Sequence, residues 1–402
     1  MIHLEIPRKL RPLVELAHSV AEGYFRPISR KYDRAEHTYP KELDLLAAAF
    51  EGMEEAGPIG DAGVRSAGRR ERAPGEIVNG SNLATVLGLT ELCWGDVGLL
   101  LTMPRQGLGN AAIAAVGTPE QKARFAGKWA AMAITEPEAG SDSAAIRTTA
   151  RDDGDAWVLD GEKIYVTCGE RADLVVVWAT LDPSLGRAAI KSFVVERGTR
   201  GMELVRLDKK MGIRASDTAV LRFEGCRVPK ENLLGSAVID TQKSFAGVMQ
   251  TFDNTRPMVA GMAVGVARAA LERAREILAG AEVKVRYGGA LHGGSRVEGE
   301  LVEMEAELEA SRLLMLKAAW MADNGRPNST EASMAKAKAA RVGNAITLRC
   351  VELCGAAGYE ERELLEKWAR DSKILDIFEG TQQIQMLVVA RRLLGKRSSE
   401  LR

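Results

Sequence analysis

Hydrophobic positions recur at helical intervals along the first third of the chain. From residue 1 to about 130, apolar residues spaced three and four apart alternate with good helix formers. One helix is predicted from Leu43, Leu46, Ala47 and Phe50. The continuous apolar stretch from Asn82 to Leu101 predicts a single buried helix, and Thr118-Pro119-Glu120 predicts an N-cap with proline in the first turn.

The pattern changes near residue 131. Up to about residue 235, short runs rich in β-branched and aromatic residues predict strands at Trp157–Leu159, Leu174–Trp178, Phe193–Val195 and Ala219–Phe223. Asp153-Gly154 and Asp160-Gly161 are predicted to be turns between strands. Because no long helices separate these runs, an antiparallel sheet or barrel is expected, and not a Rossmann unit.

Long helical patterns return after Gly235. Helices are predicted at about 240–280, 297–323, 329–356 and 382–394, with the glycine-rich stretch 288–299 separating the first two. The expected fold is therefore α+β with three domains. These are an N-terminal helical domain over 1–130, a middle β domain over 131–235 and a C-terminal helical bundle over 236–402.

Charge balance and hydropathy argue against a nucleic-acid-binding protein and against a membrane protein. The 55 basic and 55 acidic residues cancel, so the basic excess of a nucleic-acid-binding protein is missing. The N-terminus lacks the apolar region of a signal peptide, and no apolar run is long enough for a membrane span, so a cytoplasmic protein is expected. The five cysteines (Cys93, Cys168, Cys226, Cys350 and Cys354) have no zinc-site spacing and are expected to be buried free thiols.

The glycine motifs are expected to be structural. Gly107-Leu-Gly-Asn follows a proline and no strand, so it lacks the strand–turn–helix context of a dinucleotide-binding fingerprint. The glycines of 288–299 precede no Lys-Ser/Thr pair and form no P-loop. Gly261 and Gly265 are four residues apart on a predicted helix, which favours close packing against a second helix.

Six segments carry chemical information in a fixed order. They are ITEPEAGSD (Ile134–Asp142), DGEKIYVTCG (Asp160–Gly169), KMGIRASDTA (Lys210–Ala219), RVPKENLLG (Arg227–Gly235), FDNTRP (Phe252–Pro257) and RDSKILDIFEGTQQIQ (Arg370–Gln385). Together they resemble the acyl-CoA dehydrogenase family, over residues 80 to 395. The resemblance implies a helical domain, a β domain and a C-terminal four-helix bundle. It also implies FAD as cofactor, an acyl-CoA substrate, electron-transfer flavoprotein as electron acceptor, and a homo-oligomer, either a dimer or a tetramer.

Glu379 is the catalytic residue that this resemblance implies. Its carboxylate would take the pro-R α-proton of the thioester while a β-hydride moves to flavin N5. Its backbone N–H and a ribityl hydroxyl would bind the substrate carbonyl. A glutamate in water, with a pKa of about 4.3, is a weak base. Burial between the apolar run Ile377-Phe378 and the turn at Gly380 would raise that pKa toward neutrality.

The resemblance assigns further residues to the site. The substrate-binding residues it implies are Ser141, Asp253, Arg256 and Gly380. The cofactor-binding residues it implies are Met132, Ile134, Thr135, Gly140, Ser141, Tyr165, Thr167, Thr381 and Gln383. Two alternatives stay open at this point. Arg256 could form an ordinary ion pair at a helix start, and Thr135, Tyr165 and Thr167 could simply fill one face of the sheet.

Two segments depart from the family pattern. Lys284-Val-Arg-Tyr-Gly288 has lysine where the family has an arginine that reaches the FAD pyrophosphate of a neighbouring subunit, and lysine lacks the two-pronged geometry of arginine. Glu352–Tyr359 begins with glutamate where the family prefers glutamine. These departures leave two rival hypotheses beside an acyl-CoA dehydrogenase. One is an acyl-CoA oxidase on the same fold, and the other is an acyl-CoA-binding, FAD-poor subunit of a mixed oligomer.

Overall fold

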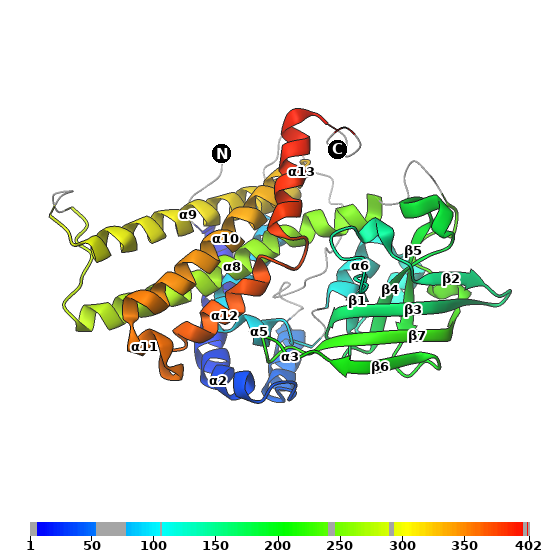
Figure 1. Ribbon diagram of the computed structural model, residues 1–402, viewed down its shortest axis with the longest axis horizontal. Helices are drawn as coiled ribbons and strands as arrows, with labels where there is room; N and C mark the ends of the chain where they lie inside the picture. The colour runs from blue at the N-terminus through cyan, green and yellow to red at the C-terminus, as the bar shows by residue number, and fades with distance from the viewer. Residues whose placement is uncertain are drawn as a thin grey trace.

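Long helices form one half of the molecule and a curled sheet forms the other (Figure 1). The computed structural model describes residues 6–53, 78–104, 107–239, 246–288, 293–396 and 400, and its description excludes the side chains of 48–53 and 246–254. The order of elements is helices, then strands, then helices. The α+β fold class predicted from the sequence is confirmed.

Seven α-helices are described before the sheet. They are α1 (Arg11–Val20), α2 (Arg26–Arg34), α3 (Glu42–Met53), α4 (Ser81–Gly95), α5 (Val97–Leu100), α6 (Leu108–Val116) and α7 (Pro119–Arg124). Helix α3 buries Leu43 and Leu46, and Thr118 forms a capping box with Gln121 at the start of α7, as predicted. The single helix predicted from Asn82 to Leu101 is wrong. Asp96 breaks it, because its carboxylate accepts the N–H of Leu99 at 2.9 Å and caps α5.

The described strands form one sheet. They are β1 (Ala130–Ala133), β2 (Thr149–Asp152), β3 (Ala156–Thr167), β4 (Leu174–Thr180), β5 (Ile190–Glu196), β6 (Met202–Leu207) and β7 (Thr218–Pro229). Their order is β1-β4-β2-β3-β7-β6, with β5 paired to β4. Most pairs are antiparallel, as predicted, but β1 runs parallel to β4, and β2 joins β4 at one parallel bridge.

One of the two predicted turns is correct. Asp153-Gly154 joins β2 to β3, and Gly154 has φ +79°. The turn predicted at Asp160-Gly161 is wrong, because β3 passes through both residues with a register shift between Leu159 and Gly161. Gly161 is needed there, since an added Cβ would lie 2.8 Å from the Cα of Thr148.

The helices after the sheet form a bundle. They are α8 (Ala246–Gly280), α9 (Arg296–Asp323), α10 (Ser329–Cys354), α11 (Ala356–Tyr359), α12 (Leu365–Leu375) and α13 (Gln382–Leu394). The four predicted helices correspond to α8, α9, α10 and α13, whereas α12 was not predicted. Helix α13 projects beyond the bundle (Figure 1). None of the helices in the described ranges is long and apolar enough to cross a membrane.

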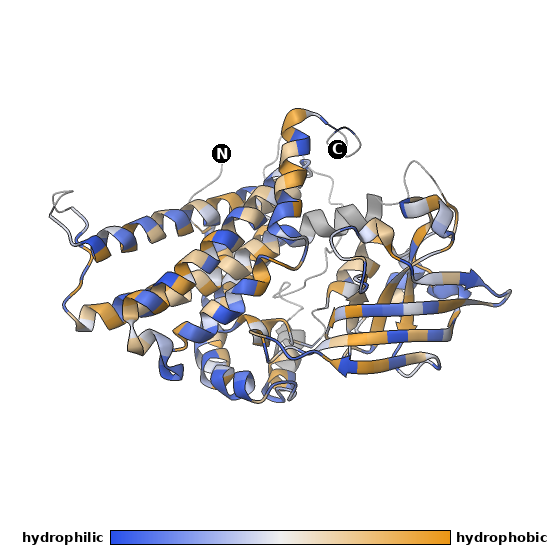
Figure 2. Cartoon of the chain, viewed as in Figure 1, coloured by the Kyte–Doolittle hydropathy of each residue, from blue (hydrophilic) through white to orange (hydrophobic). Residues whose placement is uncertain are grey.

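The helices before and after the sheet share one hydrophobic core. Buried residues of α1, α4, α8, α9, α10 and α12 belong to the same cluster, which Ile213 of the loop before β7 also joins. Hydrophobic and hydrophilic turns alternate along these helices (Figure 2). The two faces of the sheet have separate clusters. Cys93, Cys168, Cys226 and Cys350 are buried, and burial raises the pKa of their thiols, as expected for structural cysteines.

Glycines allow α8 to pack closely against α4. An added Cβ at Gly261 would lie 3.1 Å from the carbonyl oxygen of Val86, and one at Gly265 would lie 2.2 Å from that of Thr90. This agrees with the predicted packing role. Gly107 is also structural, because it precedes α6 and its added Cβ would lie 2.0 Å from the carbonyl oxygen of Ala130.

We expect Gly265→Ala to destabilise the protein by about 1–3 kcal/mol, because the methyl group has to force two backbones apart. Gly280→Ala is the matched control on the same helix, since nothing lies within 4 Å of its added Cβ. The control should leave stability unchanged or raise it by up to about 1 kcal/mol. Urea denaturation followed by circular dichroism measures both variants. Equal stability of the two variants would contradict the packing role of Gly265.

Candidate active site

Glu379 lies in a turn between α12 and α13 that has an unusual backbone conformation. Glu379 has φ +57° and Gly380 has φ +85°. A non-glycine residue in this left-handed region costs of order 1–3 kcal/mol and is found chiefly at functional sites. The buried side chain of Gln385 fixes the turn, because its Nε2 donates to the carbonyl oxygens of Glu379 and Gly380 at 3.0 and 3.1 Å. Position 380 requires glycine, since an added Cβ would lie 2.5 Å from that nitrogen.

The carboxyl group of Glu379 has one direct hydrogen bond and two basic neighbours. Thr255 Oγ1 of α8 donates to Glu379 Oε2 at 2.7 Å. Burial raises the pKa of Glu379, and this effect exceeds the opposing effects of the Thr255 hydrogen bond and of the charges on Arg256 and Lys336. The shift has the direction expected for a general base that works near neutral pH.

The backbone N–H of Glu379 has no hydrogen-bond acceptor among the described residues. The preceding N–H, that of Phe378, still donates to the carbonyl oxygen of Ile374 at 3.0 Å, so the last turn of α12 ends just before Glu379. A backbone donor left over beside a carboxylate fits a site that receives a carbonyl oxygen from outside the chain.

Arg256 of α8 is buried near the Glu379 turn. It is 4% exposed, its Nη1 lies 3.4 Å from Ser333 Oγ of α10, and its charge lowers the pKa of Glu379. The charge of Arg256 therefore acts on the proposed base, and its predicted role in substrate binding stays a prediction. Asp253 lies within α8, but its side chain is outside the described parts of the structure.

A second group of predicted residues lies where β1 and β3 end. Met132 is in β1, and Ile134 and Thr135 follow it. The N–H of Ile164 donates to the carbonyl oxygen of Thr135 at 2.9 Å, so the loop after β1 is attached to β3. On this loop Gly140 and Ser141 are exposed.

A buried ion pair that the sequence reading missed holds this loop in place. Lys163 Nζ lies 2.6 Å from Glu136 Oε1 and donates to the carbonyl oxygen of Ile134 at 3.1 Å. Glu136 also accepts from the hydroxyl of Thr148 at 2.6 Å. The sequence contained a signal for this ion pair, because Glu136 and Lys163 belong to two of the six motifs and carry opposite charges. A contact between the two motifs could have been predicted from these charges.

Tyr165 and Thr167 lie at the C-terminal end of strand β3. Tyr165 has φ +57° and is 64% exposed, next to a register shift between Lys163 and Val166. An exposed aromatic ring on a bulged strand is available to a flat ligand. The hydroxyls of Thr135 and Thr167 have no hydrogen-bond partner within the described chain. The ring of Tyr165 is therefore not packed in a sheet face, whereas Thr135 and Thr167 are half-buried and their contact with a flavin stays a prediction.

Motif residues connect the end of β3 to the helix that precedes Glu379. The N–H of Cys168 donates to the carbonyl oxygen of Asp217 at 3.1 Å, and the N–H of Ile213, in the same loop, donates to Asp371 Oδ1 of α12 at 2.6 Å. Gly212 allows this contact, because an added Cβ would lie 2.5 Å from the backbone of Arg370. The segments KMGIRASDTA and RDSK thus fix how the sheet is placed against α12.

The residues present fit a flavin on the side of Thr135, Tyr165 and Thr167, where unpartnered hydroxyls and an exposed ring lie together. Thr381 caps α13, since its hydroxyl accepts from the N–H of Ile384, and Gln383, two residues later, is exposed. At the two departures from the family pattern, Lys284 is exposed and Glu352 is paired with Arg349. Arg349 therefore offsets the negative charge of Glu352.

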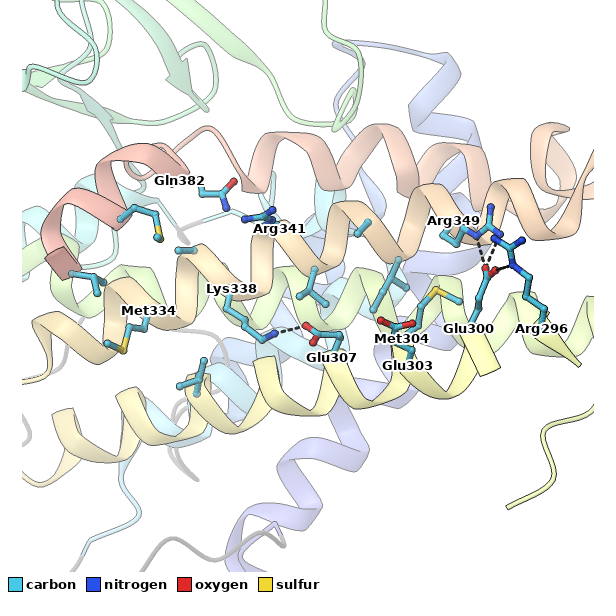
Figure 3. A pocket seen from close by; sticks show the side chains of 17 residues that line it. Arg296, Glu300, Glu303, Met304, Glu307, Met334, Lys338, Arg341, Arg349 and Gln382 are labelled. Carbon is cyan, nitrogen blue, oxygen red and sulfur yellow. Dashed lines mark hydrogen bonds and ion pairs between the residues drawn. The ribbon is translucent and has the colours of Figure 1, made fainter. Parts of the chain in front are cut away.

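A groove with a volume of about 1150 Å³ lies between α9, α10 and α13 (Figure 3). Met304, Ile346 and Met386 contribute apolar surface to it. Charged residues of α9 and α10 also line it, and Lys338 and Glu307 form an ion pair there. Thr255, the residue described in contact with the Glu379 carboxyl, does not line this groove, whereas Gln382, next to Thr381, does.

Comparisons with known proteins agree with this arrangement. Residues 131–226 match the acyl-CoA dehydrogenase middle domain, and residues 245–394 match the acyl-CoA dehydrogenase C-terminal domain. The chain is 35% identical to the mitochondrial short-chain specific acyl-CoA dehydrogenase of Bos taurus, covering 97% of this chain and 91% of the bovine one. It is 31% identical to the short-chain specific acyl-CoA dehydrogenase of Clostridium acetobutylicum, covering 94% and 96% of the two chains.

A solved structure gives the same result. Butyryl-CoA dehydrogenase from Megasphaera elsdenii superposes with a TM-score of 0.82 at 30% identity, covering 98% of this chain and all of that one (100%). The fold, the two family matches and the named relatives define an oxidoreductase. The chain belongs to the acyl-CoA dehydrogenase family.

Proposed function

We propose that this protein is an FAD-dependent acyl-CoA dehydrogenase in which Glu379 removes the α-proton of the thioester. The observation that carries the proposal is the Glu379 turn. It combines a buried carboxylate of raised pKa with a backbone N–H that has no acceptor among the described residues. A base and a carbonyl-binding donor on one residue are what α-proton abstraction requires.

Each side chain then has a role in the proposed reaction. Glu379 accepts the proton, and its backbone N–H binds the thioester carbonyl as negative charge develops there. Thr255 donates a hydrogen bond to the carboxylate, and the positive charge of Arg256 stabilises its ionised form. Bound FAD would supply the acceptor for the β-hydride, and Thr135, Tyr165 and Thr167 would contact its ring. Thr381 and Gln383 would approach the rest of the cofactor, and Ser141 and Gly380 would approach the substrate.

The names of the relatives above suggest a short acyl chain as the substrate, and the motif resemblance implies electron-transfer flavoprotein as the acceptor. A homo-oligomer is proposed because apolar side chains (Met304, Leu314, Ile346 and Met386) line the groove. The charged pairs Lys338–Glu307 and Arg349–Glu300 are already formed within one chain, so the apolar surface carries this proposal. Met386 and Leu393 of α13, which are 57% and 69% exposed, would be buried at such an interface.

Purified protein titrated anaerobically with butyryl-, octanoyl- and palmitoyl-CoA tests the proposal. We expect one FAD per chain, an oligomeric mass, and bleaching of the flavin that is fastest with butyryl-CoA. Hydrogen peroxide formed in proportion to substrate in air would favour the oxidase instead, and sub-stoichiometric FAD would favour the FAD-poor subunit. Fully bound flavin that no acyl-CoA reduces would reject the proposed reaction.

A further inference from the structure

Lys336 of α10 is a buried lysine whose ammonium group reaches the Glu379 turn. Its side chain has 0% exposure, and Nζ donates to the carbonyl oxygen of Gly380 at 2.7 Å. Lysine is almost never buried without a charge partner. Here the one hydrogen-bond acceptor described for it is a neutral carbonyl, on the residue next to the proposed base.

The charged groups around the turn come from three elements. Lys336 approaches from α10 and Arg256 from α8, while Asp376 lies in the segment after α12. Burial lowers the pKa of Lys336 to about 8, which the negative charges of Asp376 and Glu379 oppose and the positive charge of Arg256 reinforces. Lys336 in turn lowers the pKa of Glu379. The two groups therefore influence each other's protonation.

The side of α10 that carries Lys336 also carries Ser333, which contacts Arg256. Ser333 and Lys336 are three residues apart and both have 0% exposure. Met334 and Lys338 line the groove instead (Figure 3). Helix α10 thus presents one face to the proposed base and another to the groove, so Lys336 belongs to the active-site side alone.

We propose that Lys336 is a positioning residue for the base: it holds the Glu379–Gly380 turn through the Gly380 carbonyl and keeps the Glu379 carboxyl group ionised. This inference rests on the proposed function, since it assigns Lys336 to the same site. It predicts that the Glu379 titration shifts in any variant that loses the charge of Lys336, including a variant that keeps a neutral donor to the Gly380 carbonyl.

Two substitutions test this prediction. Lys336→Gln keeps a donor but loses the charge, whereas Lys336→Met loses both. Lys317→Met is the control, because Lys317 is an exposed lysine of the neighbouring helix α9, paired with Glu331. We expect the acid limb of kcat/KM for the acyl-CoA to move to higher pH in both Lys336 variants. At neutral pH kcat/KM should fall by about tenfold, with recovery as the pH rises. The control should match the wild type.

A second readout needs no turnover. The infrared band of the protonated Glu379 carboxyl, assigned by its loss in Glu379→Gln, should persist to higher pH in both Lys336 variants than in the wild type. If the wild type reduces no acyl-CoA, the proposed reaction fails while this titration still decides the role of Lys336. If Lys336→Met does not fold, Lys336→Gln decides alone. An unchanged Glu379 titration, or a loss of activity that is uniform across pH, would overturn the proposal.

Discussion

Glu379→Gln is expected to bind FAD and keep its yellow colour while losing reduction of the flavin by acyl-CoA by about 10²–10⁴-fold. Glutamine has nearly the same shape as glutamate and can still accept the hydroxyl hydrogen bond of Thr255. It cannot accept the α-proton, and losing a general base costs about this factor. Anaerobic stopped-flow absorbance with the best acyl-CoA of the panel measures the effect.

The same experiment has a pH arm and a control. Because burial raises the pKa of Glu379, the wild-type rate should fall as pH drops through this raised value, above the usual range for glutamate. Glu309→Gln changes an exposed glutamate that pairs with Arg312 on α9, and should leave the rate unchanged. Equal flavin reduction by wild type and Glu379→Gln would remove Glu379 from the mechanism.

Lys367→Met is expected to destabilise the protein by about 3–5 kcal/mol, because it leaves two buried carboxylates without their counter-charge. Lys367 Nζ lies 2.7 Å from Asp96 and 2.5 Å from Asp371, and both carboxylates have 0% exposure. This cluster joins the break between α4 and α5 to α12, and through Ile213 to the sheet. Urea denaturation followed by circular dichroism measures the loss.

The loss should depend on pH in a definite direction. Burial already raises the pKa of Asp371, with Lys367 opposing this effect, so removal of the lysine raises that pKa further. A carboxyl group with a raised pKa in the folded state stabilises the fold at low pH and loses that contribution as pH rises. The deficit should therefore be larger at neutral than at mildly acid pH. Lys373→Met, an exposed lysine on the same helix, is the control; a deficit as large there would contradict the account.

The sequence predicted elements well where the hydrophobic period is long and uninterrupted. Helices α8, α9, α10 and α13 have such patterns and were placed within several residues of their observed ends. Short elements were missed for physical reasons. β1 consists of small residues with little β signal, and α12 is interrupted by charges that turn out to be buried, such as Lys367 and Asp371.

The errors share a cause, which is a local signal overridden by a distant partner. Asp96 ends a helix inside a continuous apolar run because Lys367, 271 residues away, holds its carboxylate. Asp160-Gly161 has the composition of a turn, yet β3 continues through it because β2 and β7 pair on either side. In the candidate site, motif order predicted Glu379 and Arg256, but no local pattern marked Lys336, which lies 43 residues before Glu379 in an alanine-rich helix.

Hydrogen exchange at the α-carbon of acetyl-CoA tests most directly whether Glu379 is the base. Acetyl-CoA has no β-hydrogen, so exchange with D₂O reports proton removal without hydride transfer. We predict that the wild-type holoenzyme introduces deuterium into the acetyl group, as seen by mass spectrometry, and that Glu379→Gln introduces no more than buffer alone. Equal incorporation by the two proteins would show that another group removes the proton.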